Sequence, residues 1–561
     1  MRPGGREGPR FLRWLAAARP LIPWAVLALL AATVYFWGLG RYGLIDPDEG
    51  RYSEIPREML ESGDFVTPRL NYAKYFEKPV LHYWLTAGSF SLLGQSEFAA
   101  RLVPALCGLG GCLLTFLLAR RMTGSARAGG YSALVLAGTL LWFGVSRLNI
   151  IDMTLSFFFT AALFGYGMWL ADGEQPSGRP WLLLFYAGMA LATLSKGLVG
   201  VVLPGGIAVL HLLFARRWRD LPRIFPLLGI ALYFALTVPW FWAVCRANPD
   251  FFDFFFVHEH FTRYLTTEHG RYEPFWFFVP ILLGGLVPWT GMLWDAFRAA
   301  RGRGGLLRRE DGLFLSLWFA VPLAFFSLSG SKLVPYVLPC LPPLAVLIGA
   351  AVEGMLRGGA PAMRAGRRFA CLNVLVLLPI VLAGAVYPAL RPEDAYLRAA
   401  TNPFCFVLTA FCLASFVLLR ARTRGFLLLC LLALTALFVA GTGFDLMAAR
   451  DSRRPIAAML RERLRADDTV VAYGDLMQGL SFYLGRRIAI AGGPGELDFG
   501  AAQEEDPRWF LNAEQLRRLW NGPDRVLLAA SRRRLEELTR DLGREPVRLG
   551  ETEKEILFTN F

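Results

Sequence analysis

Long apolar stretches recur from residue 21 to residue 446 and constrain the fold more than any other feature of the sequence. A helix needs about 20 apolar residues to cross the ~30 Å hydrocarbon core of a bilayer. With 55% hydrophobic residues, the chain is also too apolar for an ordinary soluble enzyme. We therefore predict a polytopic α-helical membrane protein with about thirteen transmembrane helices. The predicted spans are 21–40, 98–119, 128–147, 152–171, 180–195, 197–215, 224–245, 275–297, 312–329, 333–352, 369–389, 403–419 and 425–446.

The distribution of arginine predicts the orientation of these spans. The formal net charge is +14, but the arginines occupy short connections and form no single basic stripe, which argues against nucleic-acid binding. They precede the first span or follow even-numbered spans, so the positive-inside rule places the N-terminus and those connections in the cytoplasm. The arginine-rich segments are 2–19, 120–127, 216–223, 298–309, 364–368 and 420–424.

Two domains are expected. Residues 1–446 form the transmembrane domain, with loops 41–97 and 246–274 on the outer side of the membrane. In residues 447–561 the apolar runs shorten and alternate with polar helical stretches, which is typical of a small α/β domain. An odd number of spans places this domain outside, in the periplasm of a Gram-negative host, where a lid or docking role is expected.

The cysteines predict no disulfide bonds, and the first apolar span does not have the pattern of a cleaved signal peptide. All eight cysteines lie in or beside predicted spans, so neither a disulfide framework nor a thiolate metal site is expected. The first span is too long for a signal-peptide core and is followed by no small-residue cleavage site, so we expect it to remain as a membrane anchor.

The outer connections carry most of the distinctive polar residues. Loop 41–97 contains DPDEGRYSE and NYAKYFEKP, with one short helix expected over 56–61, ending at Ser62-Gly63, and another from Val80 onward. Later connections supply Asp152, Lys196, Lys332 and Tyr336. Only five of the 59 basic residues are lysines, and four of these five lie in outer connections. An ammonium group is a compact, rotatable point charge, so this choice supports a specific need for lysine there.

This combination of carboxylates, lysines and tyrosines favours glycosyl transfer from a lipid-linked donor. A carboxylate such as Asp48 can activate or orient the acceptor, and a cation such as Lys78 can stabilise the departing phosphate. A polyprenyl-phosphate sugar supplies that leaving group without a nucleotide, and no Gly-rich nucleotide loop is present in the sequence. Phosphate-bearing lipids also need cations near their headgroups.

Two alternative functions and one candidate metal site remain open from the residues alone. A transporter or flippase would have ionisable groups near the membrane midplane, whereas these spans are nearly free of them. A binding or assembly protein would need no convergence of carboxylates and cations. In the loop after the seventh span, His258 and His260 lie close to Glu259 and can ligate a divalent metal such as zinc, although the sequence fixes no third ligand.

The stretch PDEGRYSEIPREMLESGDFVTPRLNYAKYFEKPVLHYW resembles the first periplasmic loop of bacterial GT-C glycosyltransferases of the protein O-mannosyltransferase-like group. The segments HEHFTRY, EPFWFFVPILLGGLVPW, SGSKLVPYVLP and LSFYLGR are similar to the same group. Within it, the strongest likeness is to the lipid A 4-amino-4-deoxy-L-arabinose transferases. The family's usual residue after the acidic pair is small and polar or alanine, and Gly50 stands there in this chain.

The resemblance implies roles for particular residues. Asp48 would be the catalytic carboxylate, and Asp152 would orient Lys78 or the acceptor. Lys78 and Arg263 would hold the lipid phosphate, while a metal would bind Glu77 together with His258 or His260. The remaining residues assigned to the substrate site are Glu49, Tyr52, Tyr75, Lys332 and Tyr336.

The resemblance also implies an inverting transferase of the bacterial inner membrane. Its donor would be undecaprenyl phosphate-linked aminoarabinose and its acceptor a lipid A phosphate. A protein hydroxyl or another glycan is the alternative acceptor. Because a phosphate is already anionic at neutral pH, Asp48 would then position the acceptor or offset charge on the sugar, whereas a hydroxyl would need a true base.

Overall fold

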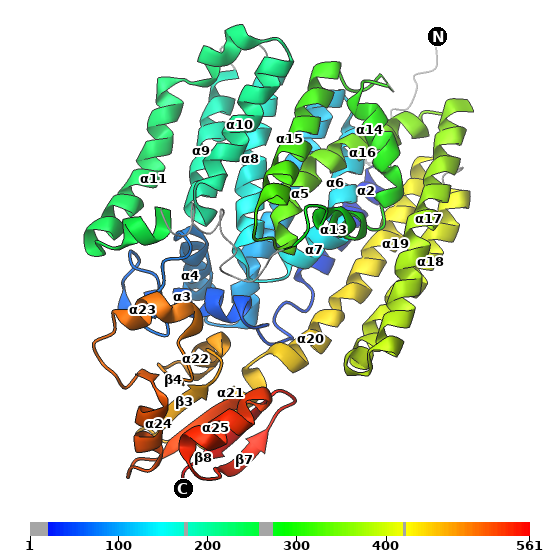
Figure 1. The fold of residues 1–561 in the computed structure, drawn as a ribbon. Helices are drawn as coiled ribbons and strands as arrows, with labels where there is room; N and C mark the ends of the chain where they lie inside the picture. The colour runs from blue at the N-terminus through cyan, green and yellow to red at the C-terminus, as the bar shows by residue number, and fades with distance from the viewer. Residues whose placement is uncertain (1–20, 173–177, 257–272, 304, 359, 419–421) are drawn as a thin grey trace, which may run out of the picture.

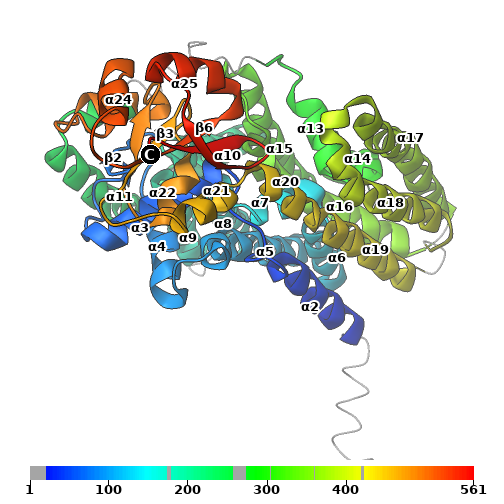
Figure 2. The ribbon, with the colours of Figure 1, turned by 90° about the horizontal axis from the view of Figure 1, so that it is seen from below.

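A bundle of long helices carries a small α/β domain at one of its ends (Figure 1). The computed structural model describes residues 21–172, 178–256, 273–303, 305–358, 360–418 and 422–561. Viewed from the end that carries the α/β domain, this domain projects over α3, α4 and α9 and leaves α17, α18 and α19 uncovered (Figure 2).

The helical part contains eighteen labelled α-helices in the described residues. They are α2 (Ile22–Phe36), α3 (Asp48–Ser62), α4 (Leu81–Leu93), α5 (Glu97–Thr123), α6 (Ala126–Ala137), α7 (Leu140–Ser146), α8 (Ile151–Asp172), α9 (Arg179–Lys196), α10 (Val199–Phe214), α11 (Leu227–Ala247), α13 (Phe278–Gly285), α14 (Leu293–Ala300), α15 (Arg309–Leu328), α16 (Leu341–Leu356), α17 (Ala360–Leu390), α18 (Arg398–Leu418), α19 (Thr423–Gly441) and α20 (Gly443–Asp451). Short 3₁₀ helices are η2 (Trp218–Ile224), η4 (Thr290–Met292), η5 (Val334–Cys340) and η6 (Pro392–Leu397).

The helical membrane architecture expected from the sequence is confirmed, but the count of thirteen spans is not. Among the described residues, eight helices are long and apolar enough to cross a membrane, or up to ten if each of two bent pairs is one span. Helices α2 and α10 are apolar but only 15 and 16 residues long. They fall short of the roughly 20 residues that a full crossing needs.

Two segments predicted as single spans are bent. In the segment 128–147, α6 and α7 meet at 64°, with Gly138 and Thr139 between them. In the segment 275–297, Phe278–Gly285 and Thr290–Ala300 meet at 107°, and Pro288 lies in the break. Proline has no backbone N–H and cannot continue the helical hydrogen-bond ladder. Hydropathy reports the apolar length of a segment but not its direction, which explains the difference.

The C-terminal part folds as the expected α/β domain around a six-stranded sheet of order β5-β4-β3-β6-β8-β7. Strands β5, β4, β3 and β6 are parallel, and β8 and β7 extend the sheet antiparallel. The strands are β3 (Thr469–Tyr473), β4 (Ala489–Ala491), β5 (Phe510–Leu511), β6 (Val526–Ser531), β7 (Val547–Glu551) and β8 (Glu555–Thr559). The helices are α21 (Arg454–Arg461), α22 (Gln478–Leu484), α23 (Asp498–Ala502), α24 (Ala513–Trp520) and α25 (Leu535–Leu542).

The side chains of β3 point alternately to the two faces of the sheet, so the core of this domain has two layers. Val470 and Ala472 pack with α21 and α22, whereas Val471 and Tyr473 face α24 and α25. Successive strand residues point to opposite faces, so one five-residue strand serves both layers. The first layer also includes Leu44 of the N-terminal loop. Shared apolar packing therefore joins the domain to the helical bundle.

A close approach between α3 and α22 completes this junction. The carboxylate of Asp46 accepts hydrogen bonds from the backbone N–H of Gly479 (3.0 Å) and from Nε of Arg453 (3.0 Å). A Cβ at Gly50 would lie 2.2 Å from Asp46 Oδ1 and 2.4 Å from Gly479 N. The glycine that departs from the family pattern therefore allows the two helices to approach this closely.

We expect Gly50→Ala to destabilise the protein by about 1–3 kcal/mol, because the α3–α22 contact must open to admit a methyl group. The midpoint of thermal unfolding of the purified protein in detergent measures the change. Gly88→Ala is the matched control, because a Cβ at this position of α4 meets no atom within 4 Å. Equal loss of stability in both variants would contradict the role given to Gly50.

Candidate active site

The first turn of α3 exposes Asp48 to solvent, and Arg51 of the same helix holds its carboxylate in place. Asp48 is the first residue of α3, and its side chain is 55% exposed. Arg51 lies one turn later with only 9% of its side chain exposed, and its Nη2 donates to Asp48 Oδ1 at 2.8 Å. A carboxylate at a helix N-terminus is also favoured by the helix dipole. Asp48 is thus an accessible carboxylate in a fixed position.

Arg51 connects Asp48 to three other side chains in two further segments of the chain. Its Nη1 donates to the hydroxyl of Tyr75 at 2.7 Å and to Glu496 Oε2 at 2.6 Å. The carboxylate of Glu77 lies 4.0 Å from the same nitrogen. Burial raises the pKa of the Glu496 carboxyl, and the positive charge of Arg51 opposes that shift. Because Glu496 belongs to the C-terminal part, that domain contributes a charged group next to the proposed catalytic residue.

Lys78 lies beside this network. Its Nζ donates to the backbone oxygen of Glu77 at 2.7 Å and lies 3.9 Å from Glu77 Oε2. Its side chain is 16% exposed. Arg51 contacts Asp48 and lies near Glu77, which is the partner of Lys78. These contacts relate Asp48, which the sequence assigns to sugar transfer, to Lys78, which it assigns to phosphate binding.

Asp152 belongs to a second charged group, which it forms with Lys196 and Tyr336. At the start of α8, Asp152 forms an ion pair with Lys196, the last residue of α9. The Lys196 ammonium lies 4.4 Å from the centre of the Tyr336 ring. Among the described residues, the ion-pair partner of Asp152 is Lys196 and not Lys78, so of the two expected roles of Asp152 only that of orienting the acceptor stays a prediction.

The tyrosines predicted at the site are positioned differently from one another. Tyr52 and Tyr75 are buried, and burial raises the pKa of both phenols, so they remain protonated. The Arg51 guanidinium lies over both rings, 5.3 Å and 5.8 Å from their centres. Tyr336 is half-buried in η5 and packs on Phe326 at 5.0 Å. Tyr52 and Tyr75 thus form the wall behind Asp48.

Two residues assigned to substrate binding are buried and contact other parts of the protein. Glu49 is buried, and its carboxylate binds Arg101 through two bonds of 2.7 Å. It also accepts the backbone N–H groups of Ile45 and Asn149. The sequence alone could not show which of the adjacent residues Asp48 and Glu49 is accessible and which is buried. Lys332 is 5% exposed and donates to the carbonyls of Glu273 and Ser329, both at 2.7 Å.

The remaining predicted residues lie outside the described part of the chain. These are Arg263, His258 and His260, so a metal held by Glu77 and one of the histidines stays a prediction. Among the described residues, no three His, Cys, Asp or Glu side chains are grouped as metal ligands would be.

A buried histidine supports the framework beneath the site. His82 on α4 has hydrogen-bond contacts with Thr154 (2.9 Å) and Asn149 (3.1 Å), and Asn149 donates to Ser53 of α3. Burial lowers the pKa of His82 to about 4. The ring is therefore neutral at physiological pH and connects α3, α4 and α8 through hydrogen bonds.

Comparison with known proteins places the chain in a family. Residues 25–255 match the family described as dolichyl-phosphate-mannose-protein mannosyltransferase, and residues 456–556 match the aminoarabinose transferase C-terminal domain. The crystal structure of ArnT from Cupriavidus metallidurans bound to undecaprenyl phosphate superimposes with a TM-score of 0.85 and 30% identity, covering 97% of this chain and 98% of that one. The chain belongs to the aminoarabinose transferase family of GT-C glycosyltransferases.

Relatives of known sequence agree with this membership. The undecaprenyl phosphate-alpha-4-amino-4-deoxy-L-arabinose arabinosyl transferase 2 of Pseudomonas fluorescens (strain Pf0-1) is 37% identical over 377 residues. The corresponding transferase of Pseudomonas aeruginosa (strain UCBPP-PA14) is 34% identical over 371 residues. Each alignment covers 66% of this chain and 66% of the relative.

Sequence reasoning missed two residues of the charged network of this family member. Arg51 lies within the first loop, three residues after Asp48, and this spacing on one helix face is a signal in the sequence for their contact. Glu496 had no signal, because it lies 445 positions from Arg51 and meets it only through docking of the C-terminal part.

The lowered pKa of His82 predicts a specific loss of stability in acid. Its neutral form is favoured in the folded state, so its contribution is complete above the unfolded pKa of about 6.5 and is lost as the pH falls toward 4. The loss can reach about 3 kcal/mol, since one pKa unit corresponds to ~1.4 kcal/mol. We expect the thermal midpoint of the native protein to fall more steeply between pH 6.5 and 4.5 than that of His82→Gln, which does not titrate. Parallel curves would refute this assignment.

Proposed function

We propose that this protein transfers 4-amino-4-deoxy-L-arabinose from undecaprenyl phosphate to a phosphate group of lipid A. The observation that carries the proposal is the match along nearly the whole chain to an aminoarabinose transferase bound to undecaprenyl phosphate. The accessible Asp48 carboxylate, held by Arg51, supports the same chemistry, as does Lys78, which is related to Arg51 through Glu77.

The proposed reaction occurs at the periplasmic face of the inner membrane. Helix α5 supports this orientation: Glu97 at its start contacts Tyr483 of the C-terminal part, and Arg120 and Arg121 lie at its other end. Arginine-rich connections favour the cytoplasm. The end of the bundle with the α/β domain and Asp48 is therefore the periplasmic one.

In the proposed mechanism, an oxygen of the acceptor phosphate attacks the anomeric carbon of the sugar from the side opposite the donor phosphate. The bond from that carbon to the donor oxygen breaks, and its electron pair leaves with undecaprenyl phosphate, so the configuration inverts. Lys78, with Arg263, neutralises the charge that collects on the leaving phosphate. Asp48 positions the acceptor or offsets positive charge on the sugar, with no need to remove a proton.

A hydroxyl acceptor on a protein is the second candidate, and the match of residues 25–255 to the protein mannosyltransferase family favours it. Expression in a strain that lacks its own aminoarabinose transferase distinguishes the two, with mass spectrometry of lipid A and of periplasmic proteins as the readout. We expect aminoarabinose on lipid A and restored polymyxin resistance. Unmodified lipid A together with newly glycosylated protein would overturn the lipid A assignment.

Asp48→Asn should lower the transfer rate by at least about 100-fold, because a positioned carboxylate contributes roughly 10²–10⁴-fold in such sites. Asp467→Asn, at an exposed position in the C-terminal part, is the control for loss of one negative charge. Transfer of the sugar by purified protein in detergent measures both. If Asp48 only positions a phosphate acceptor, the pH–rate profile of the native protein should show no limb near a carboxylate pKa. Asp48→Asn with near-native activity would exclude its catalytic role.

A further inference from the structure

A cavity of about 430 Å³ lies between α14, α16 and α17, far from Asp48. Helix α16 continues η5 into a span of 23 residues, with Tyr336 near one end and Met355, which lines the cavity, near the other. A helix of this length extends roughly 34 Å at 1.5 Å per residue, enough to cross a bilayer. The cavity therefore lies at the opposite membrane face from the candidate active site.

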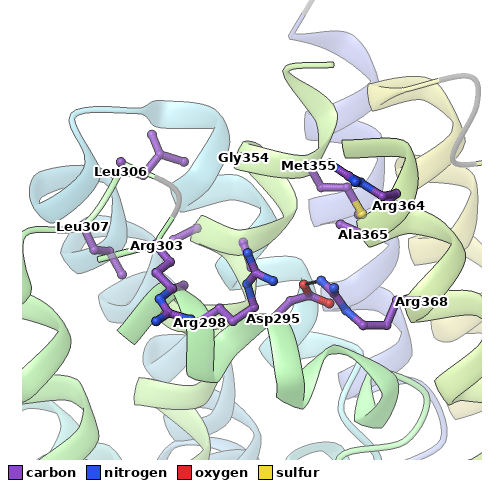
Figure 3. A pocket seen from close by; sticks show the side chains of 14 residues that line it. Asp295, Arg298, Arg303, Leu306, Leu307, Gly354, Met355, Arg364, Ala365 and Arg368 are labelled. Atoms are coloured by element: carbon purple, nitrogen blue, oxygen red, sulfur yellow. Dashed lines mark hydrogen bonds and ion pairs between the residues drawn. The ribbon is translucent and has the colours of Figure 1, made fainter. Parts of the chain in front are cut away.

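The charged lining of this cavity is strongly unbalanced. Four arginines, Arg298, Arg303, Arg364 and Arg368, surround a single carboxylate, Asp295. Arg368 forms an ion pair with Asp295, and Figure 3 shows this pair below the cavity, with Arg303 on one side and Arg364 on the other. Within the described part of the chain, Arg298, Arg303 and Arg364 have no carboxylate within ion-pair distance. The cavity thus presents three guanidinium groups whose charge no described acid neutralises.

The other walls of the cavity are apolar. Leu306 and Leu307 lie on the side of Arg303, and Met355 and Ala365 lie on the side of Arg364 (Figure 3). Guanidinium groups bind phosphate oxygens in a bidentate manner, and basic pockets between membrane helices suit anionic headgroups. A volume of 430 Å³ lies within the range of small-ligand sites.

A second, apolar groove lies on two of the same helices, α14 and α17. It is lined by Trp294 and Phe297 of α14 and by Leu372 and Val376 of α17. Arg364, Arg368, Leu372 and Val376 succeed one another at four-residue steps, so each lies about 6 Å farther along α17 than the one before and about 40° farther around it. The surface of α17 therefore changes from cationic near the start of the helix to apolar farther along. A phospholipid changes in the same order, from its phosphate to its hydrocarbon chain.

We propose that the cavity and the groove together bind an anionic glycerophospholipid of the leaflet opposite the active site. Its phosphate contacts Arg298, Arg364 and Arg368, and an acyl chain occupies the groove between α14 and α17. A bound lipid would connect three helices at a membrane face where α16 and α17 are joined by a short connection. Lipid binding at this site would stabilise the helical bundle and make its stability depend on the lipids of the membrane. It takes no part in sugar transfer.

The test uses the full-length protein in a neutral detergent, titrated separately with phosphatidylglycerol, phosphatidylcholine and inorganic phosphate. Thermal unfolding and mass spectrometry of co-purified lipid measure binding. We expect phosphatidylglycerol alone to raise the unfolding midpoint and to be enriched in the purified protein. Absence of a shift, or an equal shift with phosphatidylcholine, would refute the site. A full shift with inorganic phosphate would refute a lipid as its occupant.

Matched variants locate the effect. The double variant Arg298→Gln/Arg364→Gln should weaken the apparent affinity for phosphatidylglycerol at least tenfold, because two charge-assisted hydrogen bonds to the phosphate are lost. Arg298 and Arg364 are exposed, and the control Arg309→Gln/Arg367→Gln removes the same charge from two arginines that are also exposed but do not line the cavity. It should retain the native response. Equal weakening in both would indicate diffuse surface attraction, and no weakening in the first would exclude the cavity, so either outcome overturns the proposal.

Discussion

The ion pair between Glu49 and Arg101 is the interaction on which the geometry of the site depends. Both side chains are almost fully buried, where an unpaired charge would be severely destabilising. Arg101 is satisfied by both carboxylate oxygens and by the carbonyls of Leu39, Tyr42 and Gly43. A buried arginine with this many acceptors holds the turn after α2, the start of α3 and the body of α5 in one arrangement.

This arrangement determines where Asp48 points. Neighbouring residues on an α-helix project about 100° apart, so anchoring Glu49 inward turns Asp48 away from the core. Arg51, one turn later, returns to Asp48 and extends to Tyr75 and Glu496. The two acidic residues that look equivalent in the sequence therefore have opposite tasks. One holds the framework together through a buried pair, and the other remains accessible.

The sequence predicted the features that depend on local pattern. It indicated membrane helices from apolar length, the end of α3 at Ser62 from the following Gly63, and the α/β character of the last part of the chain. It could not predict the bend after Gly138 or the contact between Arg51 and Glu496. Both depend on packing between segments far apart in the chain, which neither periodicity nor composition records. Gly50 looked like a local irregularity, whereas the structure relates it to the approach of α22.

The division of work between lysine and arginine follows from their shapes. Arg51 and Arg101 each join several fixed acceptors through planar forks, so neither can move without loosening the framework. Lys78 and Lys196 have contacts of another kind. Lys78 contacts the backbone oxygen of Glu77, and Lys196 contacts one carboxylate and the face of an aromatic ring. An ammonium is a compact, rotatable point charge, which suits the phosphate contact proposed for Lys78. Arg51 and Arg101 act as fixed supports of the site, because several acceptors hold each guanidinium.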